Sequence, residues 1–215
     1  DKLGWFSWGA DTHMDNTLLD IKVPAAAEVK IAVVSADVTL SGVGGRSLNV
    51  DGVSGKLHLD SAAKSVEIDT VSGAVELTGS AQHTHIGSVS GNIRTHGLGG
   101  KIRIETVSGD IDAENGSYHE VNVGTVSGEI DLHGSPDEQA QVEAKSMSGD
   151  VRLYLPADVS ARLRASSFSG SIRSDFGTVA EKNHGPGSSL DATSGGGSGQ
   201  IKIESFSGDI EIRKQ

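Results

Sequence analysis

Two histidines separated by one residue are the first candidates for chemistry in this sequence. His83 and His85 would share one face of a strand, because side chains alternate in direction along a strand, and Glu67 precedes His85 by 18 residues. Two imidazoles and a carboxylate form a ligand set for Zn²⁺. Lys101 and Arg103 follow the histidines at the same interval, and their positive charge would oppose a cation there. We therefore predict no metal and no cofactor, and His83, His85 and Glu67 form the metal hypothesis to be tested.

A second candidate is a pair of carboxylates, Asp112 and Asp131, which could perform the acid–base chemistry of a polysaccharide-cleaving enzyme. Arg94 and Arg152 would flank them in one outward column. The signs of charge in this column mostly alternate, through Glu76, Arg94, Asp112, Asp131, Arg152, Arg173 and Glu211. Cross-strand ion pairing explains such alternation without catalysis, and no long loops are predicted to wall a cleft around it. We therefore predict that the chain is not an enzyme, with a polysaccharide-binding or carbohydrate-active β-helix as the alternative.

Two further ligands, calcium and ice, are suggested by similar residues that recur at one position of each repeat. A calcium-binding β-roll would need acidic residues after each turn, but the residues that follow Ser-Gly are Lys56, Ala74, Asn92, Asp110, Glu129, Asp150, Ser171 and Asp209. Lys and Ala oppose a calcium column. An ice-binding-like hydroxyl ladder would need Thr70 and Ser72, with their counterparts, in one plane. Thr70 shares the inward phase of Ile68, whereas Ser72 is expected to point outward, so this is a minor alternative.

The elements that would position these residues come from an internal repeat. Val, Met or Phe followed by Ser-Gly occurs eight times, with the first three intervals each 18 residues long. Two stretches of alternating apolar and polar residues accompany each copy, as in 66–70 and 74–78, and this period of two predicts half-buried strands. The predicted corners are Ser54-Gly55, Ser72-Gly73, Ser90-Gly91, Ser108-Gly109, Ser127-Gly128, Ser148-Gly149, Ser169-Gly170 and Ser207-Gly208.

This repeat predicts an all-β fold, a single-domain parallel β-solenoid of about nine coils with roughly 18–21 residues per coil. An antiparallel meander is the alternative. Val71, Val75 and Leu77 are expected to point inward, and Gly73 is expected at a tight inward corner where a missing Cβ permits close backbone approach. Ser72 and its counterparts would then form an outward hydroxyl ladder that serves the corner rather than a ligand.

Three segments divide the chain. Residues 1–20 do not repeat and contain Trp5, Phe6 and Trp8, which we interpret as a hydrophobic cap over the first coil, with a contact for a partner as the alternative. Residues 21–215 form the solenoid. Within it, the Gly/Ser-rich segment 174–200 has no period and is predicted to be a loop insertion that acts as a linker.

Composition limits the partners. The net charge of −11 disfavours nucleic acid and anionic membrane surfaces. The chain has no cysteine, which excludes disulfides, and no apolar run approaches the roughly 20 residues of a transmembrane segment. Because the sequence starts at Asp1, we expect that a signal segment is absent from this chain. The composition favours an extracytoplasmic location, whether periplasmic, cell-surface or secreted.

The repeats "SVSGNI", "TVSGDI", "TVSGEI", "SMSGDV" and "SFSGDI" resemble those of a bacterial adhesin family of Ser-Gly-Asp-Ile β-strand-repeat proteins, a domain of unknown function. The early "VPAAAEVKI" and the late "SDFG" and "IKIESFSGDIEI" also fit, so the resemblance covers about residues 17–215. It implies a parallel β-solenoid at the cell envelope, and it provides no catalytic residues. The chain departs from many members of this family in having no membrane helix.

These observations together predict a non-enzymatic, adhesin-like interaction or structural module of the bacterial cell envelope. Its partner would be an envelope component, either a protein or a glycan. Self-association through the ends of the solenoid is also expected, because the outer strands of a solenoid leave unpaired edges.

Overall fold

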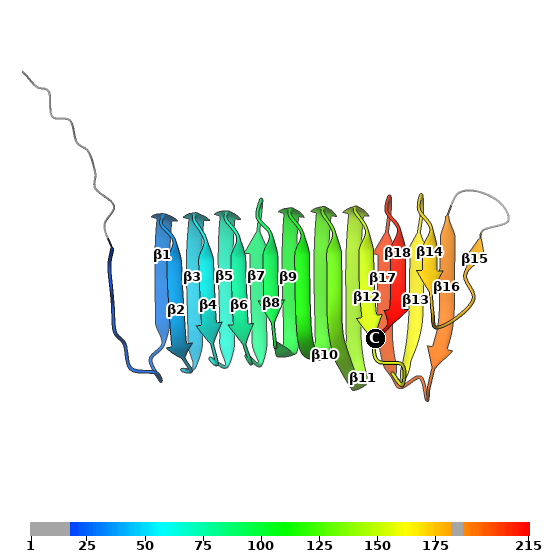
Figure 1. Ribbon diagram of the computed structural model, residues 1–215, viewed down its shortest axis with the longest axis horizontal. Coiled ribbons are helices and arrows are strands. Elements are labelled where there is room, and N and C mark those ends of the chain that lie inside the picture. Colours follow the sequence, from blue (N-terminus) through cyan, green and yellow to red (C-terminus); the bar gives the residue numbers. More distant parts are fainter. Residues whose placement is uncertain (1–17, 182–186) are drawn as a thin grey trace, which may run out of the picture.

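The computed structural model describes residues 18–181 and 187–215, and these residues form 18 strands and no helix. None of this part of the chain could therefore cross a membrane as a helix. Figure 1 shows the strands stacked side by side in a rod. The strands are β1 (Val29–Ser35), β2 (Val38–Val43), β3 (Ser47–Ser54), β4 (Leu57–Ser61), β5 (Ser65–Ser72), β6 (Val75–Gly79), β7 (His83–Ser88), β8 (Ile93–His96), β9 (Gly99–Ser108), β10 (Ile111–Ser127), β11 (Ile130–Ser148), β12 (Val151–Leu155), β13 (Ala161–Ser167), β14 (Ile172–Ser174), β15 (Ala180–Glu181), β16 (Ser188–Ser194), β17 (Gly199–Ser205) and β18 (Ile210–Lys214).

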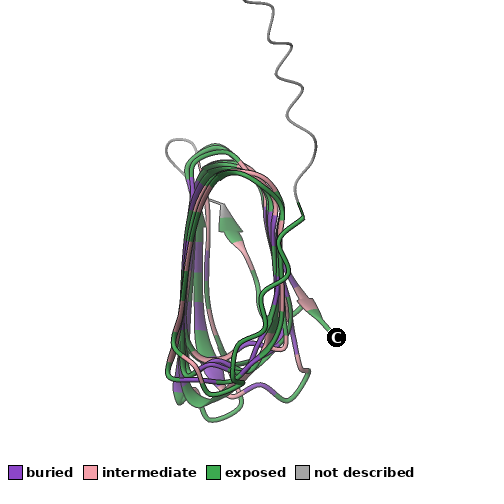
Figure 2. Cartoon of the chain, turned by 90° about the vertical axis from the view of Figure 1, so that its left-hand side faces the viewer, coloured by how far each residue is buried: buried purple, intermediate pink, exposed green. Residues whose placement is uncertain are grey.

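The strands form the two long walls of a flattened tube, which Figure 2 shows from its N-terminal end. One wall consists of β1, β3, β5, β7 and β9, the second halves of β10 and β11, and then β17, β13 and β16. The other consists of β2, β4, β6 and β8, the first halves of β10 and β11, and then β12, β18 and β14. All neighbours except those of β16 are parallel. The predicted all-β, single-domain parallel β-solenoid is confirmed, and the antiparallel meander is excluded.

The core is a set of aliphatic files between the two walls. Ile68, Ile86 and Ile104 are direct register partners in β5, β7 and β9, and each is fully buried. Each alternate residue of these strands points outward, which is why the sequence period of two predicted them. Tyr118 is buried in this core, and its hydroxyl donates to the carbonyl oxygens of Ala113 and His133, at 3.3 and 3.2 Å.

Glycine is required at the repeated corner because neighbouring coils stack backbone on backbone there. A Cβ placed on Gly73 would lie less than 3 Å from the carbonyl oxygen of Gly55, and one on Gly109 would clash in the same way with Gly91. The colliding atom is main chain, so it cannot move aside as a flexible side chain would. The predicted tight corner at Gly73 is confirmed.

The prediction that Val71 points inward is wrong. Val71 is 47% exposed, whereas Thr70 before it and Val75 after the corner are buried. β5 runs to Ser72 and the chain bends at Gly73, but the alternation of burial ends at Thr70, because Val71 and Ser72 are both exposed. The predicted outward orientation of Ser72 is confirmed.

The last coil is not last in space. β17 lies between β11 and β13, and β18 lies between β12 and β14 (Figure 1). The Val151 amide donates to the carbonyl of Asp209 and the Ile210 amide donates to the carbonyl of Ser171, both at 2.9 Å. The solenoid therefore has about seven turns in chain order. Two further coils, β13–β14 and β17–β18, are stacked in reverse order.

The segment 174–200 is not wholly irregular. It contains β15 and β16, and β16 pairs antiparallel with β13 over seven register partners from Ala161↔Ser194 to Ser167↔Ser188. β16 thus covers the outer edge of β13 at the C-terminal end of the rod. At the other end, Leu18 and Leu19 are exposed, and the predicted cap residues Trp5, Phe6 and Trp8 lie outside the described residues.

Replacing a corner glycine should destabilise the protein far more than replacing an outward one. We expect Gly109→Ala to lower the free energy of unfolding by about 3 kcal/mol, because the new methyl group meets a fixed carbonyl. Gly124→Ala is the control, since its Cβ would find only Lys145 O at 4.0 Å and the change should cost less than about 1 kcal/mol. Urea unfolding of both variants checks this, and equal losses would contradict the stacking argument.

Candidate functional site: the repeated corner and its polar columns

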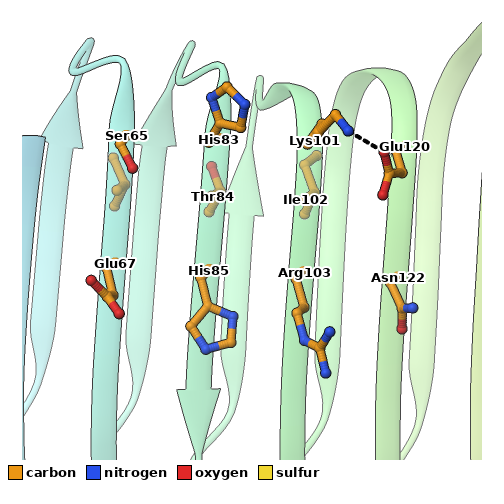
Figure 3. A pocket seen from close by; sticks show the side chains of 11 residues that line it. Ser65, Glu67, His83, Thr84, His85, Lys101, Ile102, Arg103, Glu120 and Asn122 are labelled. Atoms are coloured by element: carbon orange, nitrogen blue, oxygen red, sulfur yellow. Dashed lines mark ion pairs between the residues drawn. The ribbon is translucent and has the colours of Figure 1, made fainter. Parts of the chain in front are cut away.

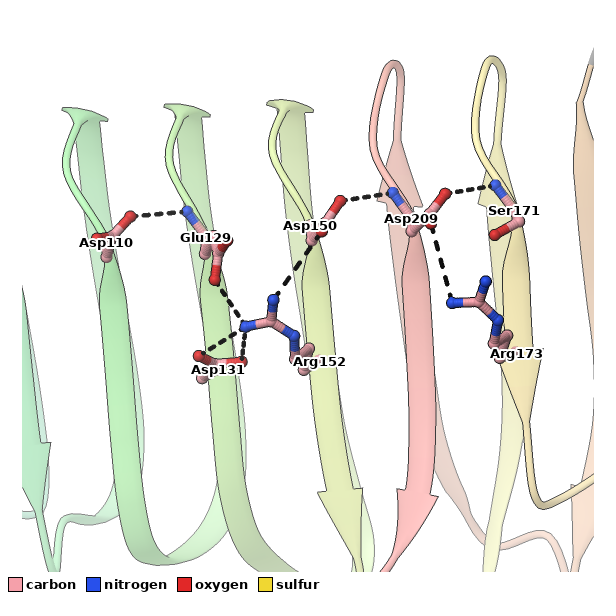
Figure 4. A network of polar contacts seen from close by, with 8 residues as sticks. All are labelled: Asp110, Glu129, Asp131, Asp150, Arg152, Ser171, Arg173 and Asp209. Atoms are coloured by element: carbon pink, nitrogen blue, oxygen red, sulfur yellow. Dashed lines mark hydrogen bonds and ion pairs between the residues drawn. The ribbon is translucent and has the colours of Figure 1, made fainter.

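At four of the Ser-Gly corners the residue after the glycine caps the backbone of a neighbouring coil. The Asp110 carboxylate accepts the amide of Glu129 at 3.0 Å, and Asn92 accepts the amide of Asp110 at 3.1 Å. Asp150 accepts the amide of Asp209, which in turn accepts the amide of Ser171, both at 2.8 Å (Figure 4). These contacts explain the Asp and Asn of the repeat as structural caps, a role that our sequence reading did not find.

The column that contains the two candidate carboxylates is a chain of ion pairs. Asp112 and Asp131 are direct register partners, as predicted. Asp112 pairs with Arg94 at 3.3 Å, and Asp131 pairs with Arg152 at 3.3 Å. Arg152 also pairs with Glu129 at 2.6 Å (Figure 4). Each carboxylate is therefore engaged by an arginine in a neighbouring coil.

The inserted coil separates two arginines of this column. Sequence order places Arg152 next to Arg173, which would leave two like charges in adjacent coils. The structure places Glu211 between them, with Arg152↔Glu211 and Glu211↔Arg173 as register partners. Opposite charges on adjacent strands stabilise a sheet, so the column favours the observed order of the coils.

Asp131 is the carboxylate of this pair whose pKa is raised above its ordinary value. Partial burial raises the pKa of Asp131, and the charge of Arg152 counteracts this only in part. The Asp112–Asp131 pair lies in a shallow depression of about 320 Å³ that also contains Arg94 and Glu129. A carboxyl of raised pKa beside a second carboxylate can in principle donate a proton to a bound polymer.

The histidines of the metal hypothesis lie in a second depression, of about 380 Å³, on the opposite wall (Figure 3). His85 has Glu67 as one register partner and Arg103 as the other, and Lys101 is the register partner of His83. The predicted flanking by two cations is confirmed. No group of three His, Asp or Glu side chains in the described part of the chain is arranged to hold a metal ion.

The cations of this depression are themselves engaged. Lys101 pairs with Glu120 at 2.6 Å, and this hydrogen bond is the main cause of the lowered pKa of Glu120. Arg103 pairs with Glu105 at 2.6 Å, and Glu67 accepts a hydrogen bond from Asn49 at 3.0 Å. The depression is therefore a polar surface held by its own contacts.

An exposed apolar ridge runs along the corner and was missed by the sequence reading. Its members are direct neighbours from coil to coil, and their exposed fractions lie between 44% and 59%. The rings of Phe168 and Phe206 are stacked with centroids 4.9 Å apart. We call this surface the corner ridge, and it consists of Val53, Val71, Val89, Val107, Val126, Met147, Phe206 and Phe168. The signal was present in the repeat, because a large apolar residue precedes each Ser-Gly.

The hydroxyl ladder does not form the plane that an ice-binding face would need. Thr70, Thr106 and Thr125 are buried between the walls, whereas Ser72 is exposed at the corner. The Oγ1 atoms of Thr106 and Thr125 have no hydrogen-bond partner among the described residues. The two hydroxyl columns therefore lie on opposite sides of the wall, as the strand phase predicted.

The sequence profile of the Toastrack DUF4097 family matches residues 13–114 and again residues 98–213. The chain belongs to the Toastrack DUF4097 family. This family is a domain of unknown function, so membership supports the fold and the repeat but assigns no activity. No curated protein and no solved structure matches this Toastrack chain. The resemblance to the adhesin family of Ser-Gly-Asp-Ile repeats stays a prediction.

Removing one corner cap should weaken the stack. We expect Asp209→Ala to lower the free energy of unfolding by about 1 kcal/mol, because the amide of Ser171 loses its acceptor. Asp209→Asn is the matched control and should cost less, since Asn92 performs the same capping in its own coil. Urea unfolding at neutral pH measures both variants, and equal losses would contradict the capping role.

The same cap predicts a pH dependence. The amide of Ser171 holds the pKa of Asp209 below its ordinary value, so the stability that Asp209 contributes is present above the unfolded-state pKa of about 3.9. This contribution is lost as the pH falls through the lowered folded-state pKa. The advantage of the wild-type chain over Asp209→Asn should therefore shrink in acid, and an advantage that grows would contradict this assignment.

Proposed function

We propose that this Toastrack chain is a non-enzymatic interaction or structural module of the bacterial cell envelope, located outside the cytoplasm. The observation that supports this most is the corner ridge. Soluble monomers rarely leave a contiguous apolar strip of this kind in water, and such strips usually mark contact surfaces. Because the ridge is built on stacked backbone, its side chains keep a fixed spacing and can meet a partner without reordering.

The two walls offer less to a partner than the ridge does. Their charged side chains are engaged with one another, as in the Arg152–Glu129 and Lys101–Glu120 pairs, and a partner would have to replace those contacts. The net charge of −11 opposes anionic lipid. These two facts favour a protein or a glycan of the envelope, bound along the ridge.

A carbohydrate-active function is the second candidate, and it rests on the raised pKa of Asp131 beside Asp112. Release of reducing ends from an envelope polysaccharide, lost in the double variant Asp112→Asn with Asp131→Asn, would support it. The arginine contacts of both carboxylates favour the structural interpretation, in which no polysaccharide is cleaved.

Binding to envelope fractions should depend on the corner ridge. We expect the purified chain to co-sediment saturably with one fraction among peptidoglycan, outer membrane and inner membrane, at low and at high salt. The double variant Val89→Glu with Val107→Glu should bind at least about tenfold more weakly, because two apolar contacts are lost and two charges must be desolvated.

The matched control is Ser90→Glu with Ser108→Glu, which adds the same charges to the adjacent exposed column and should bind nearly as the wild type does. A variant with Trp5, Phe6 and Trp8 replaced by Ser tests the N-terminal segment in the same assay. No binding of the wild-type chain to any fraction, or equal binding by both double variants, would contradict the proposal.

A further inference from the structure

The two ends of the rod differ in whether their outer strand has a partner. At the C-terminal end, β13 is covered by the antiparallel strand β16. At the N-terminal end, β1 pairs only with β3 and β2 pairs only with β4 among the described strands. Residues 18–28 run alongside this end in Figure 1, but none of them is part of a strand. The outer edge of β1 therefore presents amide and carbonyl groups that no described strand satisfies.

β1 lacks the features by which proteins normally protect an edge strand. Its sequence, VKIAVVS, contains one charged residue, Lys30, with no proline and no bulge. Ile31 and Val33 are only half-buried, whereas Val50, the register partner of Ile31, is fully buried. A flat, apolar, nearly uncharged edge of this length is a template for another strand, and the apolar interior of the rod is open beside it.

The sequence of β1 is complementary to itself. An antiparallel pair that overlaps over all seven residues is centred on Ala32, and it places Ile31 opposite Val33 of the second copy. Inward residues then meet inward residues, so the two apolar interiors become continuous. Lys30 faces Val34 of the other copy, so no like charges oppose each other.

We propose that the outer edge of β1 is a self-association surface and that its occupant is a second copy of this chain. Two rods join head to head about a two-fold axis through Ala32, and their β1 strands form an antiparallel pair. This pair between molecules resembles the antiparallel pairing of β16 with β13 within one molecule. The pair satisfies the edge groups of β1 and covers the open end of the core. Leu18, Leu19 and Ile21, which are 94%, 77% and 68% exposed, lie at this end and become partly covered. This proposal does not depend on the corner ridge.

The sharpest test is a charge exchange at Ala32, an exposed position at the centre of the proposed pair. Sedimentation velocity of the full chain should show a concentration-dependent dimer. Ala32→Glu and Ala32→Lys, each alone, should weaken dimerisation at least about tenfold, because like charges meet across the axis. An equal mixture of the two variants should recover the dimer as a heterodimer. Ser166→Lys is the control, since β13 already has a partner on both edges and this change should leave the dimer intact.

Three results would overturn the proposal. A wild-type chain that stays monomeric at every concentration would exclude the pairing. A dimer that persists in both Ala32 variants would place the contact elsewhere. A dimer that forms only after removal of residues 1–17 would mean that the N-terminal segment of the same chain is the normal occupant of the edge.

Discussion

The close contact between corner glycines of neighbouring coils is the constraint on which the rest of this structure depends. The carbonyl of Gly91 leaves no room for a side chain on Gly109, where only the α-hydrogen fits. The same contact recurs from coil to coil along the rod. Because the backbones stack at a fixed corner, every strand enters its wall in the same register. Parallel β-sheet follows, with one residue of each coil directly beside its counterpart in the next.

Because the register is fixed, residues at the same position of each repeat form a column. Each column has its own role in the structure. Inward aliphatic files provide the apolar burial that stabilises the fold. The column after the glycine caps backbone amides, as Asp209 does for Ser171. Outward charges pair either with the next coil, as Arg152 does with Asp131, or within one strand, as Arg103 does with Glu105. The side chain before each serine lies on the outside of the corner, where neither wall covers it. The apolar side chains at this position form the corner ridge.

Most of the fold could be read from the sequence, because glycine spacing and strand period reflect local constraints. The exposure of Val71 could not, since the alternation of buried and exposed residues fails at the end of β5, where Val71 and Ser72 are both exposed beside the corner. The order in which the last coils stack could not be predicted from the sequence either. All coils share one pattern, so any two can stack, and the observed order depends on contacts distant in sequence, such as Glu211 between Arg152 and Arg173. The spacing of 38 residues from Phe168 to Phe206, with its aperiodic segment, indicated an irregular path but not the order of the coils.

The candidate site was less predictable than the fold, for the same reason. The repeat predicted which side chains share a column, so the pairing of Asp112 with Asp131 and of Glu67 with His85 is confirmed. It could not show how each carboxylate is used. Whether an aspartate caps an amide, pairs with an arginine or is partly buried depends on side-chain geometry in the neighbouring coil, and Asp209, Asp112 and Asp131 differ in this respect.

Native-state hydrogen exchange tests the stacking account most directly. Terminal strands normally exchange early, because they fray. Here β17, although close to the C-terminus in sequence, has a parallel partner on each side. The account predicts that the amides of Ile201 and Ile203 are as strongly protected as that of Val142 in β11, and more strongly than that of Ile31 in β1. Fast exchange in β17, comparable to a fraying end, would contradict the insertion of the last coil into the stack.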